Sequence, residues 1–234
     1  MTFLNNSLNI IKISFFAFIL ISHSACFKNS STGKVTAQSQ HNTKVWILER
    51  HPQVIHPLIS ELFDKTYVRL KNGIHTIDPK LLDSLNTPTL YVIETDEVTA
   101  FSLCDGSIFL STALIGKAAS SEIFAAIISH ELAHNLSNDA CYSNKDSDIE
   151  FSNELRADSL GAKILYASYI NPRASLTALS LYNRKNLRDE SDILIKKRKN
   201  ELLEYLDRFP QIRSEIPEER LFRKVKALLM TKKY

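Results

Sequence analysis

Apolar residues recur at helical spacing over much of the chain. In residues 52–67 they occupy positions 55, 58, 59, 62 and 63, which lie on one face of an α-helix. Residues 121–136 are apolar on most sides of a helical projection, which indicates a buried helix. The same periodicity and its capping signals predict further helices over residues 79–85, 149–169, 171–187, 191–209 and 217–230.

Short runs of β-forming residues predict a small sheet between these helices. Strands are expected at residues 90–93, 98–103 and 107–110, and the Asp105-Gly106 pair favours a hairpin turn between the last two. Only five glycines occur in the chain, which favours helices over a glycine-rich β fold. The expected fold class is therefore mainly α with a small β-sheet (α+β).

Composition and charge exclude some classes of ligand but do not identify the function. The chain has 234 residues, enough for one domain with a sizeable core. A net charge of +3 is too small to indicate a nucleic-acid partner, and the sequence contains no glycine-rich phosphate loop. We therefore expect neither nucleic acid nor nucleotide among the ligands.

The N-terminal region resembles an export signal. Residues 10–21 form an apolar run too short to span a bilayer but suited to a signal-peptide core, and a small residue followed by Cys26 resembles a bacterial lipoprotein cleavage site. We predict a signal peptide at 1–25, a polar flexible tether at 26–43 and the main folded domain at 44–234. Plain secretion and an uncleaved anchor remain alternatives, because His23 and the weakly charged start depart from the usual pattern.

The segment HELAH at residues 130–134 carries the clearest chemistry. On a helix, the four-residue spacing places His130 and His134 on the same face, where two imidazole nitrogens can bind one Zn²⁺ ion. Glu131 between them can accept a proton from a water molecule. Two solvated histidines on a surface helix are the alternative interpretation, but the flanking residues are strongly apolar.

A second acidic pair is predicted to complete this site. Glu154 follows His134 by 20 residues, which leaves room for a loop and a returning helix that brings in a third ligand. Asp158 lies one helical turn further and can accept the ring N–H of a histidine ligand, for which His130 is the expected partner. Taken alone, the two carboxylates would also fit a solvated acidic face.

Together, HELAH at 130–134 and ELRADSLGA at 154–162 resemble the gluzincin metallopeptidases of the HtpX and CAAX-prenyl-protease kind. The segment AFSLCDGSIFLSTALI at 100–115 is similar to the hairpin that precedes the zinc helix in that family. The resemblance implies a zincin-like domain with one Zn²⁺ per chain bound by His130, His134 and Glu154. It also implies endopeptidase activity on a protein or peptide substrate, with Glu131 as catalytic base.

One departure from that family concerns its C-terminal His-Pro pair and arginine. Residues 214–220 read SEIPEER, so the histidine is missing, and Arg220 is the expected positive group near the site, with Arg213 as a weaker candidate. The missing histidine leaves open a catalytically weak or inactive lipoprotein that acts as a chaperone or scaffold. The basic residues 196–199 are interpreted as a solvated face or as a weak attraction to anionic lipid.

The targeting signals and the cysteines together predict a location. A lipidated Cys26 would anchor the protein to the membrane on the periplasmic side of a bacterial cell envelope. Cys104 and Cys141 would then remain in an oxidising compartment, where a disulfide between them becomes feasible.

Overall fold

The computed structural model describes residues 33–34, 36–143, 147–182, 190–214 and 218–232. The predictions for residues 10–21 and Cys26 lie outside these described residues. The described chain is mainly helical with a small sheet, and the expected α+β fold class is confirmed. Among the described helices, none combines the length and the apolar character needed to cross a bilayer.

A three-stranded sheet lies against the helices and has the order β2-β4-β3. β2 (Thr89–Ile93) runs parallel to β4 (Ser107–Ser111), which pairs antiparallel with the short edge strand β3 (Ala100–Ser102). The predicted hairpin is confirmed, and Gly106 in its turn has a φ of 87°, a backbone conformation that favours glycine. A second, two-stranded pairing joins β1 (Gly33–Lys34) to β5 (Tyr142–Ser143).

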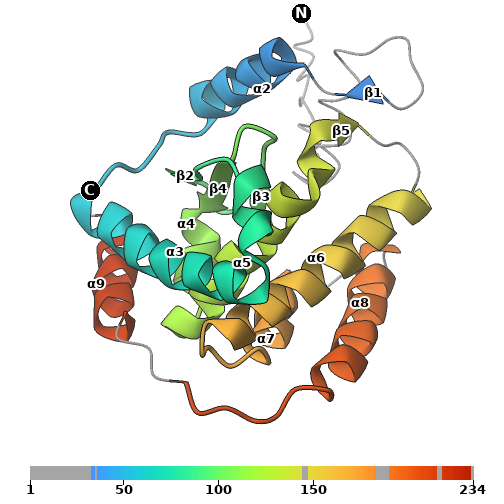
Figure 1. The fold of residues 1–234 in the computed structure, drawn as a ribbon. Helices are drawn as coiled ribbons and strands as arrows, with labels where there is room; N and C mark the ends of the chain where they lie inside the picture. The colour runs from blue at the N-terminus through green and yellow to red at the C-terminus, as the bar shows by residue number, and fades with distance from the viewer. Residues whose placement is uncertain (1–32, 35, 144–146, 183–189, 215–217, 233–234) are drawn as a thin grey trace, which may run out of the picture. The chain divides into compact units, whose positions relative to one another are not determined.

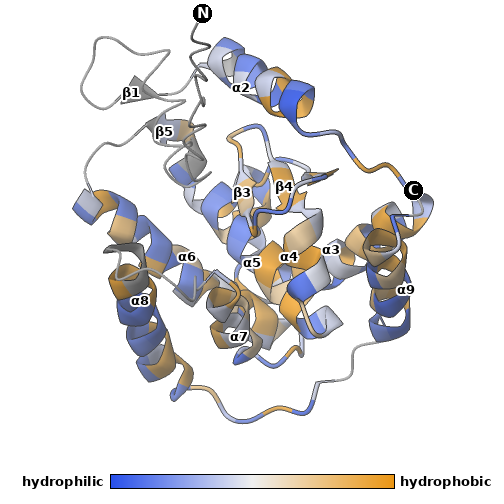
Figure 2. Cartoon of the chain, turned by 180° about the vertical axis from the view of Figure 1, so that it is seen from behind, coloured by the Kyte–Doolittle hydropathy of each residue, from blue (hydrophilic) through white to orange (hydrophobic). Residues whose placement is uncertain are grey.

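The central helix α5 (Ser121–Ser137) is buried along most of its length (Figure 1). Ser120 caps it, accepting a hydrogen bond from the backbone N–H of Ile123. Figure 2 shows hydrophobic colour over much of α5, whereas hydrophilic and hydrophobic residues alternate on α8 (Glu190–Leu206). α5 thus supplies much of the core as well as the HELAH segment.

The remaining helices pack around α5 and the sheet. α6 (Ser147–Ala167) lies beside α5, and α8 packs on α6 (Figure 1). The others are α3 (Pro57–Ile77), the 3₁₀ helix η1 (Pro79–Ser84), α4 (Thr112–Lys117), the 3₁₀ helix η2 (Asp139–Cys141), α7 (Ala174–Ser180) and α9 (Glu219–Met230).

Two element predictions need correction. The tether predicted at 26–43 is helical in its last part, because α2 (Ala37–Arg50) begins after the capping residue Thr36. Trp46 and Ile47 of α2 pack with Ile93 and Phe109 of the sheet, a long-range contact that local composition does not reveal.

The helix predicted at 171–187 is shorter than expected. The side chain of Asn171 accepts a hydrogen bond from the backbone N–H of Arg173, and α7 begins only at Ala174. This side-chain bond stabilises a turn in place of the first helical turn. Residues 183–187 of the predicted helix lie outside the described residues.

Gly161 allows α6 to approach α5 closely at His130. A Cβ atom at position 161 would lie 3.2 Å from the backbone nitrogen of His130 and 3.3 Å from the carbonyl oxygen of Ser129. The Ser129 hydroxyl donates to the Gly161 carbonyl at 2.8 Å, which fixes the two helices at this point. The spacing of the two helices therefore depends on a residue without a side chain.

We expect Gly161→Ala to push α6 away from α5 and to weaken metal binding. Overpacking a core typically costs about 1–3 kcal/mol, and the better helix propensity of alanine returns about 1 kcal/mol of this. A net loss of about 1 kcal/mol in unfolding free energy should appear in urea titrations, together with weaker zinc binding in a chelator competition assay.

The matched control is Gly116→Ala in α4, where the added Cβ meets only the flexible end of Met230. The control should keep both stability and metal affinity. Equal zinc affinity in Gly161→Ala and the wild type would contradict the idea that helix spacing sets the site.

Candidate metal centre

Three side chains from two helices converge at the middle of α5. The Nε2 atoms of His130 and His134 lie 3.1 Å apart, and the Glu154 carboxylate from α6 lies 3.5 Å from the first and 3.3 Å from the second. Within the described residues, this is the one group of histidine, cysteine and acidic side chains whose ligand atoms are close enough to hold a metal ion. The structure thus brings together the three predicted ligands.

The geometry of this group fits a tetrahedral zinc site. Ligand atoms at the usual Zn–N and Zn–O distances are separated by about 3.3 Å along a tetrahedral edge, and the observed separations lie close to that value. Two imidazoles and one carboxylate are also the donor set of catalytic zinc sites, which keep the fourth position for water.

Each histidine ligand is oriented by a carboxylate on its other ring nitrogen. His130 Nδ1 lies 3.1 Å from Asp158, the partner expected from the sequence. His134 Nδ1 lies 3.2 Å from Asp139, a contact that the sequence analysis missed. Asn138 ends α5 in the left-handed conformation and folds the chain back, so that Asp139 reaches the histidine in the preceding turn. Both rings therefore present Nε2 to the metal position.

Arg198 of α8 contacts both carboxylates of α6. Its Nη1 lies 2.6 Å from Glu154 Oε2, while its Nε and Nη2 each lie 2.8 Å from an oxygen of Asp158. The side chain is only 11% exposed, although residues 196–199 were interpreted as a solvated face or a lipid contact. That interpretation is wrong for Arg198, because it shares a helix face with the buried residues Leu202 and Leu206. The 198, 202, 206 spacing was the signal that could have revealed it.

The prediction that Arg220 is the positive group near the site is not supported by its position. Arg220 is exposed near the start of α9, and the adjacent Glu219 accepts hydrogen bonds from the backbone N–H and the hydroxyl of Ser121. Ser121 precedes His130 by nine residues, about 14 Å along a helix. Arg213, the weaker candidate, is also exposed.

Glu131 is buried beside the histidines and faces the edge strand. A hydrogen bond from Ser102 of β3 stabilises its charged form. Burial raises the pKa of Glu131, although the two histidines and this bond act in the opposite direction. Tyr182, which follows α7, is a further neighbour not identified from the sequence. Burial and the charge of Glu131 raise its pKa well above the usual value and keep the phenol neutral.

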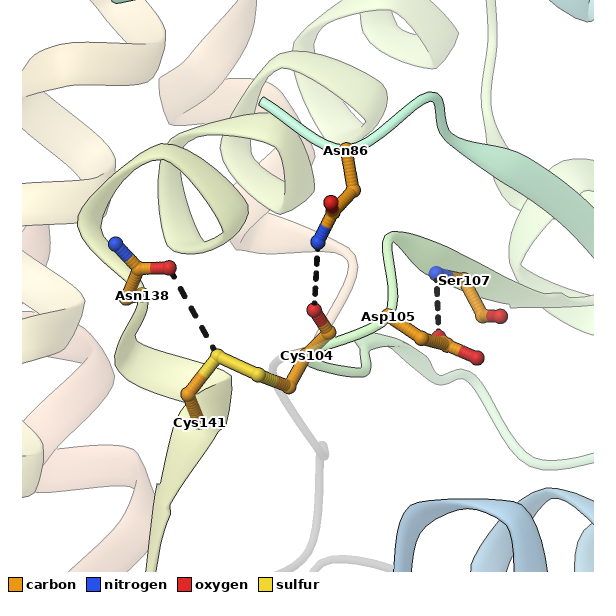
Figure 3. Close-up of a disulfide and its surroundings, with 6 residues drawn as sticks. All are labelled: Asn86, Cys104, Asp105, Ser107, Asn138 and Cys141. Carbon is orange, nitrogen blue, oxygen red and sulfur yellow. Dashed lines mark hydrogen bonds between the residues drawn. A yellow bond between two sulfur atoms is a disulfide. The ribbon is translucent and has the colours of Figure 1, made fainter. Parts of the chain in front are cut away.

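A disulfide joins two segments that support the site (Figure 3). Cys104 in the β3–β4 turn is bonded to Cys141 in η2, with their Cα atoms 4.7 Å apart. Each cysteine lies two residues after a side chain that contacts the site, Ser102 in one case and Asp139 in the other. The side-chain amide of Asn86, a residue outside the β3–β4 turn, donates to the Cys104 carbonyl at 3.0 Å and stabilises this turn.

The described fold and the group formed by His130, His134 and Glu154 fit a metallopeptidase. A comparison with known protein families matches residues 70–148, about a third of the chain, to Peptidase family M48. Over this segment the chain is similar to a family of zinc metallopeptidases. The match ends before Glu154 and Asp158, so their arrangement around the histidines is independent support. No curated protein matched the chain.

The charges around the site predict that metal binding releases protons. Burial opposes the charged form of His130, but hydrogen bonds to Asp158 and Glu154 outweigh it and raise the pKa to about 9. For His134 the opposing effect of burial is overcome by Glu154 and Asp139, and the pKa rises to about 10. Zinc requires both Nε2 lone pairs, so it must displace protons that the metal-free protein still holds at pH 7.

We expect the release of between about one and two protons per ion at pH 7, because the two Nε2 atoms are too close for both to point N–H bonds at each other. Calorimetric titrations in buffers of different ionisation enthalpy measure this number. Zinc affinity should therefore still rise with pH above about 7.5, where histidines with ordinary pKa values near 6.5 would already be mostly neutral. A pH-independent affinity over this range would contradict the raised pKa values.

Proposed function

We propose that this metallopeptidase is a zinc-dependent endopeptidase. The observation that supports this best is the convergence of His130, His134 and Glu154 with a buried glutamate on the same helix. Zinc bound there would lower the pKa of a water molecule and polarise the peptide carbonyl. The Glu131 carboxylate accepts the proton of the attacking water and passes it to the nitrogen of the leaving amine.

The position of Glu131 beside an edge strand supports a polypeptide substrate. β3 lies at the edge of the three-stranded sheet, and its Ser102 is hydrogen-bonded to Glu131. Extended peptides bind many proteins by adding a strand to a sheet edge. A substrate paired with β3 would place a peptide bond close to the Glu131 carboxylate, which favours cleavage within a chain.

We expect Glu131→Gln to retain zinc and to lose proteolysis. The amide is similar in shape but cannot accept the proton, and removal of a general base typically lowers the rate by about 10²–10⁴-fold. Cleavage of casein, with and without a chelator, together with metal analysis of the purified protein, measures both properties.

Glu122→Gln, in the first turn of the same helix, is the matched control and should retain activity. Equal cleavage by Glu131→Gln and the wild type would remove Glu131 from the mechanism. A wild-type protein that holds zinc without cleaving any protein would instead indicate the binding or scaffolding alternative.

We further propose that the protein acts in the bacterial cell envelope, anchored through a lipid on Cys26 and directed at exported or envelope proteins. The signal-like segment at 10–21 supports this proposal, as does the Cys104–Cys141 disulfide. Disulfides persist in oxidising compartments and are rare in the cytosol.

Mass spectrometry of the mature protein from bacterial membranes should find an N-terminus at Cys26 that carries the mass of a covalent lipid. Cys26→Ser should leave the protein unprocessed and without that mass. A mature N-terminus elsewhere and without lipid would indicate plain secretion, and an intact residue 1 in the wild type would indicate an uncleaved anchor. Either result would overturn the lipoprotein assignment.

A further inference from the structure

We propose that Arg198 is a positioning residue that holds Glu154 as a ligand through a single oxygen and keeps Asp158 aligned on His130. This inference rests on the proposed zinc site but not on any catalytic activity. It concerns a residue outside both sequence motifs, contributed by a helix that follows the metal-binding segments in the chain.

The guanidinium group contacts both carboxylates through all three of its nitrogen atoms. Nε and Nη2 form a fork on Asp158, and Nη1 reaches Glu154 Oε2 at 2.6 Å. Three of the five N–H donors of the guanidinium are therefore directed at the carboxylates of α6. Arg198 accordingly acts through Glu154 and Asp158.

The contact with Arg198 gives the two oxygens of Glu154 different roles. Oε2 accepts from Arg198 at 2.6 Å and lies 3.5 Å from His130 Nε2, whereas Oε1 lies 3.3 Å from His134 Nε2. A carboxylate can bind a metal ion through one oxygen or through both. With Oε2 held by the arginine, Oε1 remains the donor, and a coordination position stays open for water.

The contact with Asp158 extends this control to the first histidine. Asp158 Oδ1 is shared between Arg198 Nη2 at 2.8 Å and His130 Nδ1 at 3.1 Å. The fork therefore fixes the carboxylate that orients the His130 ring. One arginine thus positions two of the three metal ligands, one directly and one through Asp158.

Packing holds Arg198 in this position. Leu202 and Leu206, one and two turns further along α8, are buried against Ala162 of α6. Ala162 lies two turns after Glu154 on the same helix. The apolar contact between α8 and α6 therefore fixes the position of the guanidinium along α6, next to both carboxylates.

The charge and the geometry of Arg198 have opposite effects on metal binding, which makes the proposal testable. A positive charge next to the site repels Zn²⁺, so the loss of charge alone would strengthen binding. Loss of the residues that orient metal ligands typically weakens binding by about 10–100-fold. Zinc affinity, measured by chelator competition without any substrate, separates these effects.

We expect Arg198→Gln and Arg198→Lys both to lose about 10–100-fold in zinc affinity, since neither can form the fork on Asp158 while also reaching Glu154. Lys196→Gln, which removes an exposed charge from the same helix, is the matched control and should bind zinc as the wild type does. The lysine variant keeps the charge and so provides a test even if the glutamine variant fails to fold.

Coordination is read separately in the cobalt-substituted proteins. Visible absorption bands of Co²⁺ weaken as the coordination number rises, so a switch of Glu154 to two-oxygen binding in Arg198→Lys should lower their intensity. Zinc affinity in Arg198→Gln that is equal to or above the wild-type value, with wild-type affinity in Arg198→Lys, would reduce Arg198 to a counter-charge and overturn the proposal. Absence of proteolysis in the wild type would not affect either measurement.

Discussion

The contact between α5 and α6 at Gly161 determines whether the metal site exists. The histidines lie on one helix and the carboxylates on the other, so the site forms only when the two backbones come close at the level of His130. The hydrogen bond from Ser129 to the Gly161 carbonyl fixes that level. Asp158 and Glu154 lie three and seven residues before Gly161, which is about one and two helical turns. They therefore share the face of α6 that meets the two imidazoles.

The two histidines have matching sets of charged neighbours. Each histidine has a carboxylate on Nδ1, and each of those carboxylates contacts an arginine: Arg198 on the Asp158 side and Arg156 on the Asp139 side. The two sets differ in exposure, because Arg156 is 49% exposed and Arg198 only 11%. Burial makes the Arg198 set the stronger electrostatic influence. Burial alone would raise the pKa of Glu154, but Arg198 and His134 hold it well below its usual range.

The parts of the site that follow a local spacing rule were predictable from the sequence. Two histidines four residues apart, and two acids four residues apart, share a helix face wherever the helix packs, so their placement required no knowledge of the tertiary fold. Asp139 and Arg198 were not predictable in this way. Asp139 depends on the left-handed turn at Asn138, and Arg198 depends on which face of a charged helix meets α6. Likewise, α2 is stabilised by packing on the sheet, which the polar composition of residues 36–43 conceals.

The disulfide has a consequence for how the metal centre would respond to a cut in the backbone. The Cys104–Cys141 bond encloses all of α5, so a single break in the backbone between these positions leaves both fragments covalently linked. A single cut in this part of the backbone therefore cannot separate the helix that carries His130 and His134 from the rest of the molecule.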